Sequence, residues 1–238
     1  AWFRRALAST PEVHRTEHNG CGINFLTWGS PGAPGLLFIH GGAAHAHWWS
    51  FVVPLLADHY RVAAMDLTGH GDRLGGIVIL DSPVTAPDPE IDAARGGKVF
   101  GPLRVYPDLD TALGRFRTVP EQDHYLPYVM DHVARHSLRE VDGGWSWKYD
   151  PDIFVPGRRE SRELLNAVSC RVALFRSEHG LVTPEIGEYM YDQLGRVAPV
   201  VEIPEAGHHV MLDQPLLLLT ALRTLLADWE HSSPLTQR

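Results

Sequence analysis

The 238-residue sequence lacks the features that mark secreted, membrane-spanning or nucleic-acid-binding proteins. It has two cysteines, Cys21 and Cys170, which form neither a disulfide framework nor a metal-binding spacing. Apolar runs such as Leu216–Leu219 are far too short to cross a bilayer, and no stretch near Ala1 has the order of a signal peptide. The formal net charge of −8 argues against nucleic acid or an anionic membrane as a partner. We therefore expect a cytoplasmic protein.

The remaining composition is that of a soluble globular protein, with 44% hydrophobic and 21% charged residues. The length fits one domain, or one core that carries an inserted lid. From residue 85 to residue 160, prolines, charges and aromatic residues are mixed, with a plausible helix between Pro120 and His136. We therefore expect a core made of residues 1–84 and 161–238, and a lid formed by residues 85–160.

Within the predicted core, short apolar segments alternate with amphipathic ones. Seven segments are expected to be strands: Val13–Thr16, Ile23–Trp28, Leu36–Ile39, Arg61–Asp66, Ile77–Leu80, Val172–Phe175 and Val200–Ile203. The first two should form a hairpin, and Leu36–Ile39 should be buried on both faces of a sheet. This alternation predicts an α/β fold with a doubly wound, mostly parallel sheet.

The helices have weaker signals. Trp48–Tyr60 and Ser161–Val168 are expected to be helical. Thr183 should cap a third helix that has Pro184 at its first position. Asp213 should cap the last one, whose buried stripe is predicted to comprise Leu216, Leu219, Leu222, Leu226 and Trp229.

Residues with catalytic chemistry follow the predicted strands. His40, Asp66, Asp81, the Arg176–His179 segment and His208 all come at predicted strand ends. In a parallel sheet, ligands bind beyond the carboxyl ends of the strands. We therefore expect these residues to share one edge of the sheet.

Three motifs give the chain a resemblance to the α/β-hydrolase family. They are His40-Gly41-Gly42 after a strand, the D-x-x-G-H-G loop that runs from Asp66 to Gly71, and Gly207-His208 after the last strand, followed by Asp213-Gln214-Pro215. The resemblance covers nearly the whole chain and implies an α/β-hydrolase fold with an inserted helical lid.

The resemblance also implies roles for single residues. His208 corresponds to the family's general base, which takes a proton from the nucleophile and returns it to the leaving group. The acid that orients this histidine has two candidates. Asp81 matches members in which the acid follows the sixth strand, and Glu178 lies one residue before the commoner position, which is occupied here by His179. We favour Asp81.

Other residues would complete such a site. Gly42, or Ala43 beside it, would supply one backbone N–H to an oxyanion hole, and Trp48 and Trp147 would contact a small-molecule substrate. No cofactor and no metal are expected. His45-Ala46-His47 and His70-Gly71-Asp72 look like fragments of a metal site, but zinc needs three or four converging ligands.

Three functions stay open at this stage. The first is a hydrolase of a small ester, or of a related acyl or carbon–carbon substrate, with a nucleophile–Asp–His triad. The second has the same fold with an aspartate nucleophile, as in haloalkane dehalogenases and epoxide hydrolases; Ala43 stands where epoxide hydrolases tend to carry proline. The third is a catalytically inactive α/β-hydrolase that serves as a binding module.

The sequence contains no G-x-S-x-G elbow, the motif that carries the family's nucleophile. The nearest strings are Gly144–Lys148 and Gly29–Gly32. Between Asp66 and Ile77 the chain has ten residues for a connection that usually takes a dozen or more and a helix. We therefore predict a further segment between about Asp72 and Arg73.

Intact mass spectrometry of the native protein tests this prediction. A protein with a further segment has a mass clearly above 26.5 kDa, the mass of the printed sequence. A measured mass of 26.5 kDa contradicts the prediction.

Overall fold

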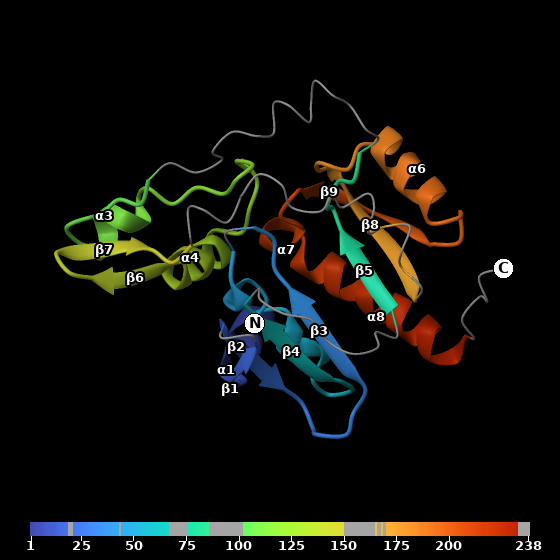
Figure 1. Ribbon diagram of the computed structural model, residues 1–238, viewed down its shortest axis with the longest axis horizontal. Helices are drawn as coiled ribbons and strands as arrows, with labels where there is room; N and C mark the ends of the chain where they lie inside the picture. Colours follow the sequence, from blue (N-terminus) through green and yellow to red (C-terminus); the bar gives the residue numbers. More distant parts are fainter. Residues whose placement is uncertain are drawn as a thin grey trace. The chain divides into compact units, whose positions relative to one another are not determined.

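A computed structural model of the protein describes residues 1–18, 21–42, 44–66, 76–85, 102–149, 165, 168 and 170–232. The chain forms two compact units, whose elements are labelled in Figure 1. The first unit comprises Ala1–His70, Phe100–Thr118 and Tyr125–Phe154, and the second comprises Gly71–Val99, Val119–His124 and Val155–Arg238. The segment expected as a lid thus contributes to both units.

The first unit contains a four-stranded sheet in the order β1-β2-β4-β3. Its strands are β1 (Glu12–His18), β2 (Cys21–Trp28), β3 (Gly35–Ile39) and β4 (Arg61–Met65), preceded by helix α1 (Trp2–Ala8). The expected hairpin is confirmed, because β1 and β2 pair antiparallel with Glu12 opposite Thr27. Strand β4 lies between β2 and β3, and its inward side chains Val62 and Ala64 are fully buried.

The prediction that Leu36–Ile39 is buried on both faces is wrong. Leu37 and Ile39 are 47% and 50% exposed in β3. Among the described residues, β3 pairs only with β4 and is therefore an edge strand. An unbroken apolar run indicates a strand, but it does not indicate what covers each face.

The predicted helix over Trp48–Tyr60 is also wrong. This segment contains two short 3-10 helices, η1 (Ala46–Trp48) and η2 (Val53–Leu56). Pro54 has no N–H to donate and disfavours helical geometry at the preceding residue, so an α-helix cannot continue through it. The segment is nevertheless core, since Phe51, Val52 and Val53 are completely buried.

The rest of the first unit contains helices α3 (Leu109–Leu113) and α4 (Pro127–His136) and a hairpin of β6 (Leu138–Val141) and β7 (Gly144–Trp147). Helix α4 ends where we expected but starts later, at a proline in the first turn. This hairpin was not predicted from the sequence. Its signal was Asp142-Gly143, a two-residue turn between alternating segments, with Gly143 at a φ of 83°.

The second unit contains a three-stranded parallel sheet in the order β5-β8-β9. Its elements are β5 (Gly76–Leu80), β8 (Arg171–His179), α6 (Pro184–Gln193), β9 (Val200–Gly207), α7 (Val210–Asp213) and α8 (Pro215–His231). The three predicted strands are confirmed, and β8 extends through the Arg176–His179 segment that we placed after it. The Thr183 cap is confirmed as well, because its hydroxyl accepts from the Ile186 amide. Most of the predicted helix Ser161–Val168 lies outside the described residues.

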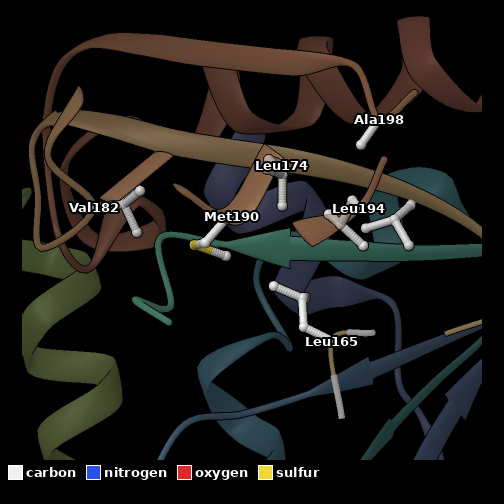
Figure 2. Close-up of a cluster of buried hydrophobic side chains, with 7 residues drawn as sticks. Leu165, Leu174, Val182, Met190, Leu194 and Ala198 are labelled. Atoms are coloured by element: carbon white, nitrogen blue, oxygen red, sulfur yellow. The ribbon is translucent and has the colours of Figure 1, made fainter. Parts of the chain in front are cut away.

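Helices pack on both faces of this sheet. Ile79 lies opposite Leu174 in the register of β5 and β8, so both side chains point to the same face. On that face they meet α6 in a cluster shown in Figure 2, whose buried members are Leu165, Val172, Leu174, Val182, Met190, Leu194 and Ala198. On the other face, Gly76 lies against Trp229 of α8. The doubly wound arrangement is confirmed for this sheet.

Helix α8 differs in detail from its prediction. Its buried residues are Pro215, Leu218, Leu219, Leu222, Leu225 and Leu226, whereas Leu216 is 45% exposed. The prediction that Asp213 caps this helix is wrong, because Gln214 is the N-cap residue and its side chain makes no cap bond. The Asp213 carboxylate instead accepts from the Gly207 amide.

The described residues form three sheets, and β3 and β5 are edge strands of two of them. The short connection between β4 and β5, residues 67–75, lies outside them. None of the described helices combines the length and the apolar character needed to span a membrane.

Two glycines that begin parallel strands should respond differently to alanine. A Cβ on Gly76 would lie 2.3 Å from the Trp229 ring, whereas a Cβ on Gly35 would meet nothing within 4 Å. Gly76→Ala should lower the free energy of unfolding by about 1–3 kcal/mol through overpacking. Gly35→Ala should change it by less than about 0.5 kcal/mol. Urea unfolding of both variants measures the difference, and equal stabilities would contradict this packing.

Candidate active site

The second unit brings Asp81 and His208 into contact. Asp81 directly follows β5 and His208 directly follows β9, and the His208 Nδ1 lies 2.8 Å from the Asp81 Oδ2. Because an ionised carboxylate can only accept, the His208 Nδ1 carries the hydrogen. The Nε2 of this tautomer is then free to accept a proton. The His208 side chain is 22% exposed and the Asp81 side chain is fully buried.

The Asp81 carboxylate is held by backbone amides. Its oxygens accept from the amides of Ser177 at 3.1 Å, Leu181 at 2.8 Å and Val182 at 3.3 Å. The Asp81 backbone has a φ of 42°, a left-handed conformation that is unfavourable for a residue with a side chain. Such strain persists only where surrounding contacts fix it, and here the amides and His208 do so. The carboxylate is therefore preorganised to orient the imidazole.

Gly180 makes room for this carboxylate. A Cβ at Gly180 would lie 2.3–2.5 Å from the carboxylate atoms of Asp81. No side chain can occupy this position unless the carboxylate moves. The glycine is thus explained by close approach to Asp81.

The alternative acid, Glu178, lies elsewhere. Its Oε2 accepts from the backbone amide of Glu205, whereas the carboxylate on the His208 Nδ1 is that of Asp81. Glu178, His179 and Glu205 also bring three possible ligand atoms within 4.8 Å of one another, but all three residues are exposed. Exposed groups of this kind are common without an ion.

His209, next to His208, is not equivalent to it. Its backbone amide donates to the Gln122 Oε1 at 2.8 Å, and its ring Nε2 lies 3.3 Å from the Pro120 carbonyl oxygen. Burial, and secondarily the neighbouring His208 ring, lowers the pKa of His209 to about 4. His209 is therefore neutral at neutral pH.

In the first unit, His40 and Asp66 follow the adjacent strands β3 and β4. The His40 Nδ1 donates to the Gly41 carbonyl at 2.7 Å, and its Nε2 lies 3.8 Å from the Asp66 Oδ1. The same Asp66 oxygen accepts from the Ala46 amide at 2.9 Å. Burial lowers the pKa of His40. These contacts fix the turn that contains Gly42, whereas Ala43 lies outside the described residues.

The His45-Ala46-His47 fragment joins a cluster of histidine rings that includes His132 and His136. The His47 and His136 ring centroids are 4.3 Å apart, and the His45 Nε2 lies 3.0 Å from the Ser137 Oγ. Burial, and secondarily neighbouring histidines, lowers the pKa of His45 to about 2 and those of His47 and His132 to about 4. The other fragment, His70-Gly71-Asp72, lies outside the described residues.

The predicted substrate contacts are both aromatic and partly or fully buried. Trp48 is 8% exposed. Trp147 packs against the rings of Tyr106 and Phe116, with centroid distances of 5.7 and 6.0 Å. Their contact with substrate stays a prediction. Ser146, in the string nearest to an elbow, lies in β7, is 4% exposed and donates to the Arg104 carbonyl, so it is no nucleophile.

Comparison with curated proteins finds an esterase. The chain is 24% identical to esterase Rv0045c of Mycobacterium tuberculosis, over 91% of this chain and 89% of that protein. The alignment spans 273 residues, more than the 238 of this chain, so the esterase has residues where this chain has none. A shorter match, 41% identical over 66 residues, is to a fluoroacetate dehalogenase of a Burkholderia species and covers 28% of this chain and 19% of the dehalogenase. No family model matches the chain.

Solved structures resemble the chain over nearly its whole length. E-2-(acetamidomethylene)succinate hydrolase has a TM-score of 0.75 at 18% identity and covers 91% of this chain and 99% of its own. The thioesterase domain from the curacin biosynthetic pathway has a TM-score of 0.71 at 20% identity, covering 90% and 99%. At these identities the likeness establishes the fold.

Alanine at Gly180 should disrupt the contact between Asp81 and His208. The added Cβ displaces the buried carboxylate, which then loses hydrogen bonds worth about 1–3 kcal/mol each. We expect lower stability in urea unfolding and a changed nitrogen chemical shift of the His208 ring. Gly187→Ala is the matched control, because its Cβ would have only ordinary contacts at 3.8 Å and beyond. An unchanged His208 signal in Gly180→Ala would contradict the geometry.

Proposed function

We propose that this chain, which has the α/β-hydrolase fold, is a hydrolase of small esters in which His208 is the general base and Asp81 orients it. The observation that carries the proposal is the 2.8 Å contact between the His208 Nδ1 and a completely buried carboxylate. A histidine fixed in this tautomer presents a free Nε2, as proton transfer requires. The likeness to an esterase supports the ester as substrate class.

The reaction would proceed through proton transfers at one imidazole. The Nε2 of His208 takes the proton of the attacking hydroxyl, and the resulting imidazolium is stabilised by the Asp81 carboxylate. The imidazolium then gives the proton to the leaving alcohol, and water repeats the sequence on the acyl group. Asp81 keeps its negative charge throughout.

The remaining parts of the proposal rest on the resemblance to the α/β-hydrolase family. The backbone N–H groups of Gly42 and Ala43 would bind the oxyanion that forms during the attack. Trp48 and Trp147 would contact the small-molecule substrate. No cofactor takes part, and no nucleic acid or membrane is needed. We also propose a cytoplasmic location, based on the small number of cysteines.

The nucleophile would belong to a segment between Asp72 and Arg73. Three observations support this part of the proposal. The connection between β4 and β5 is short, the described sheets end at β3 and β5, and the esterase has residues that this chain lacks. A segment with a strand and an elbow would account for all three.

Activity and covalent labelling test the proposal together. The native protein should hydrolyse an aryl ester and react with a fluorophosphonate probe. His208→Ala should reduce turnover by roughly 100- to 10,000-fold, and Asp81→Asn by roughly 100-fold or more. His231→Ala, which alters a histidine at the exposed end of α8, is the control and should retain activity. Turnover that survives His208→Ala would refute the assigned base.

A dehalogenase with an aspartate nucleophile is the second candidate. The local identity to a fluoroacetate dehalogenase supports it, as does an acid that follows β5. Release of fluoride from fluoroacetate, without labelling by the fluorophosphonate, would favour this function over the esterase.

A catalytically inactive binding module is the third candidate, favoured by the missing elbow motif. An intact mass of 26.5 kDa with neither turnover nor labelling would establish it.

A further inference from the structure

The turn that carries His208 is held on both sides of this residue by two side chains. The amide of Gly207, the preceding residue, donates to the Asp213 Oδ2 at 2.6 Å. The amide of His209, the following residue, donates to the Gln122 Oε1 at 2.8 Å. The backbone on either side of His208 is therefore fixed by side chains from two other segments.

Gln122 and Asp213 are also bonded to each other. The Gln122 Nε2 donates to the Asp213 Oδ2 at 3.0 Å and to the His124 carbonyl at 2.9 Å. One amide group thus accepts from the turn with its oxygen and donates to the carboxylate with its nitrogen. Because an amide has both functions and a carboxylate only accepts, glutamine suits this position and glutamate does not.

The glycine at position 207 is explained by this network. A Cβ at Gly207 would lie 2.7 Å from the Cδ and Oε1 of Gln122. The Gln122 amide therefore lies directly against the Gly207 backbone. A larger residue at 207 would displace Gln122 and, with it, the acceptor for the His209 amide.

The position of Asp213 is not explained by helix capping. It ends α7, does not cap α8, and its Oδ1 is buried without a hydrogen-bond partner among the described residues. Burial raises the pKa of Asp213 to about 6, although the Gly207 and Gln214 amides favour its charged form. Burying a carboxylate costs free energy. We therefore attribute its presence here to the hydrogen bonds that it accepts from Gly207 and Gln122.

We propose that Gln122 and Asp213 are positioning residues, which hold the Gly207–His209 turn so that the His208 ring stays on Asp81. This inference rests on the proposed function, since it assigns how the general base is kept in place. The proposal means that Val119–His124, a segment of the predicted lid, helps to orient the general base. This segment belongs to the second unit, as His208 does.

Gln122→Glu is the most informative variant, because it preserves size and the acceptor while replacing the donor. Above pH 6, the new carboxylate and Asp213 repel each other across a distance that was 3.0 Å. Near pH 5.5, the two carboxyl groups can share a proton and restore the bond. We expect kcat to fall roughly 10-fold or more at pH 8 with KM little changed, and to return to within roughly threefold of the wild type at pH 5.5.

Other titratable groups near the pair must be accounted for. His124 lies in the same segment as Gln122 and interacts electrostatically with Asp213. His208 and His209 lie in the turn itself. Glu205 precedes the turn in β9. The wild type carries the same groups, so the ratio of variant to wild type at each pH isolates the effect of position 122. Asp213→Asn, which cannot ionise, should remove the pH dependence of this ratio when combined with Gln122→Glu.

A spectroscopic measurement separates this inference from the proposed function. The ¹⁵N chemical shifts of the His208 ring report its tautomer and its bond to Asp81 even in a protein that hydrolyses no ester. They should change in Gln122→Ala and in Gln122→Glu at pH 8, but not in Thr183→Ala, which removes a helix cap in the same unit. Unchanged His208 shifts in both Gln122 variants would overturn the inference, whatever the activity. Changed shifts in a protein without turnover would refute the proposed function alone.

Discussion

The burial of the Asp81 carboxylate is the constraint on which the second unit depends. A charged group without exposure must be compensated by hydrogen bonds, and here three backbone amides and one imidazole supply them. These partners come from β8, from the loop after it and from the turn after β9. One carboxylate therefore fixes three neighbouring segments, and it requires a left-handed backbone at Asp81 and a glycine at position 180.

The position of His208 is fixed through both its ring and the turn after β9. Its ring is bonded to Asp81, and its flanking amides are bonded to Gln122 and Asp213. Glu178, the other candidate for the acid, accepts from the Glu205 amide in β9, two residues before this turn. The Asp81 carboxylate thus binds the imidazole of His208, whereas the Asp213 and Glu178 carboxylates and the Gln122 amide bind backbone N–H groups nearby.

The errors of the sequence analysis have physical causes. The helix expected over Trp48–Tyr60 failed because apolar and aromatic content predicts burial, while Pro54 decides the local geometry. The exposure of Leu37 and Ile39 depends on the neighbours of β3, and an apolar run carries no information about them. The β6–β7 hairpin lies in a segment of mixed prolines, charges and aromatic residues, and its local signal is the Asp142-Gly143 turn. The Asp66–Gly71 loop motif lies outside the described residues, so its predicted role stays a prediction.

The sequence by itself determined the strands other than β6 and β7, their alternation with helices, and the placement of His40, Asp66, Asp81 and His208 at strand ends. Hydrophobic periodicity and turn residues are local properties, so they can be recognised directly in the sequence. Only the tertiary structure decided which carboxylate contacts His208. It also showed that Asp213 and Gln122 bind the turn around His208, and that Asp213 does not cap α8. Those contacts join residues up to 127 positions apart, and hydrogen bonds between distant loops follow from packing, which no local pattern encodes.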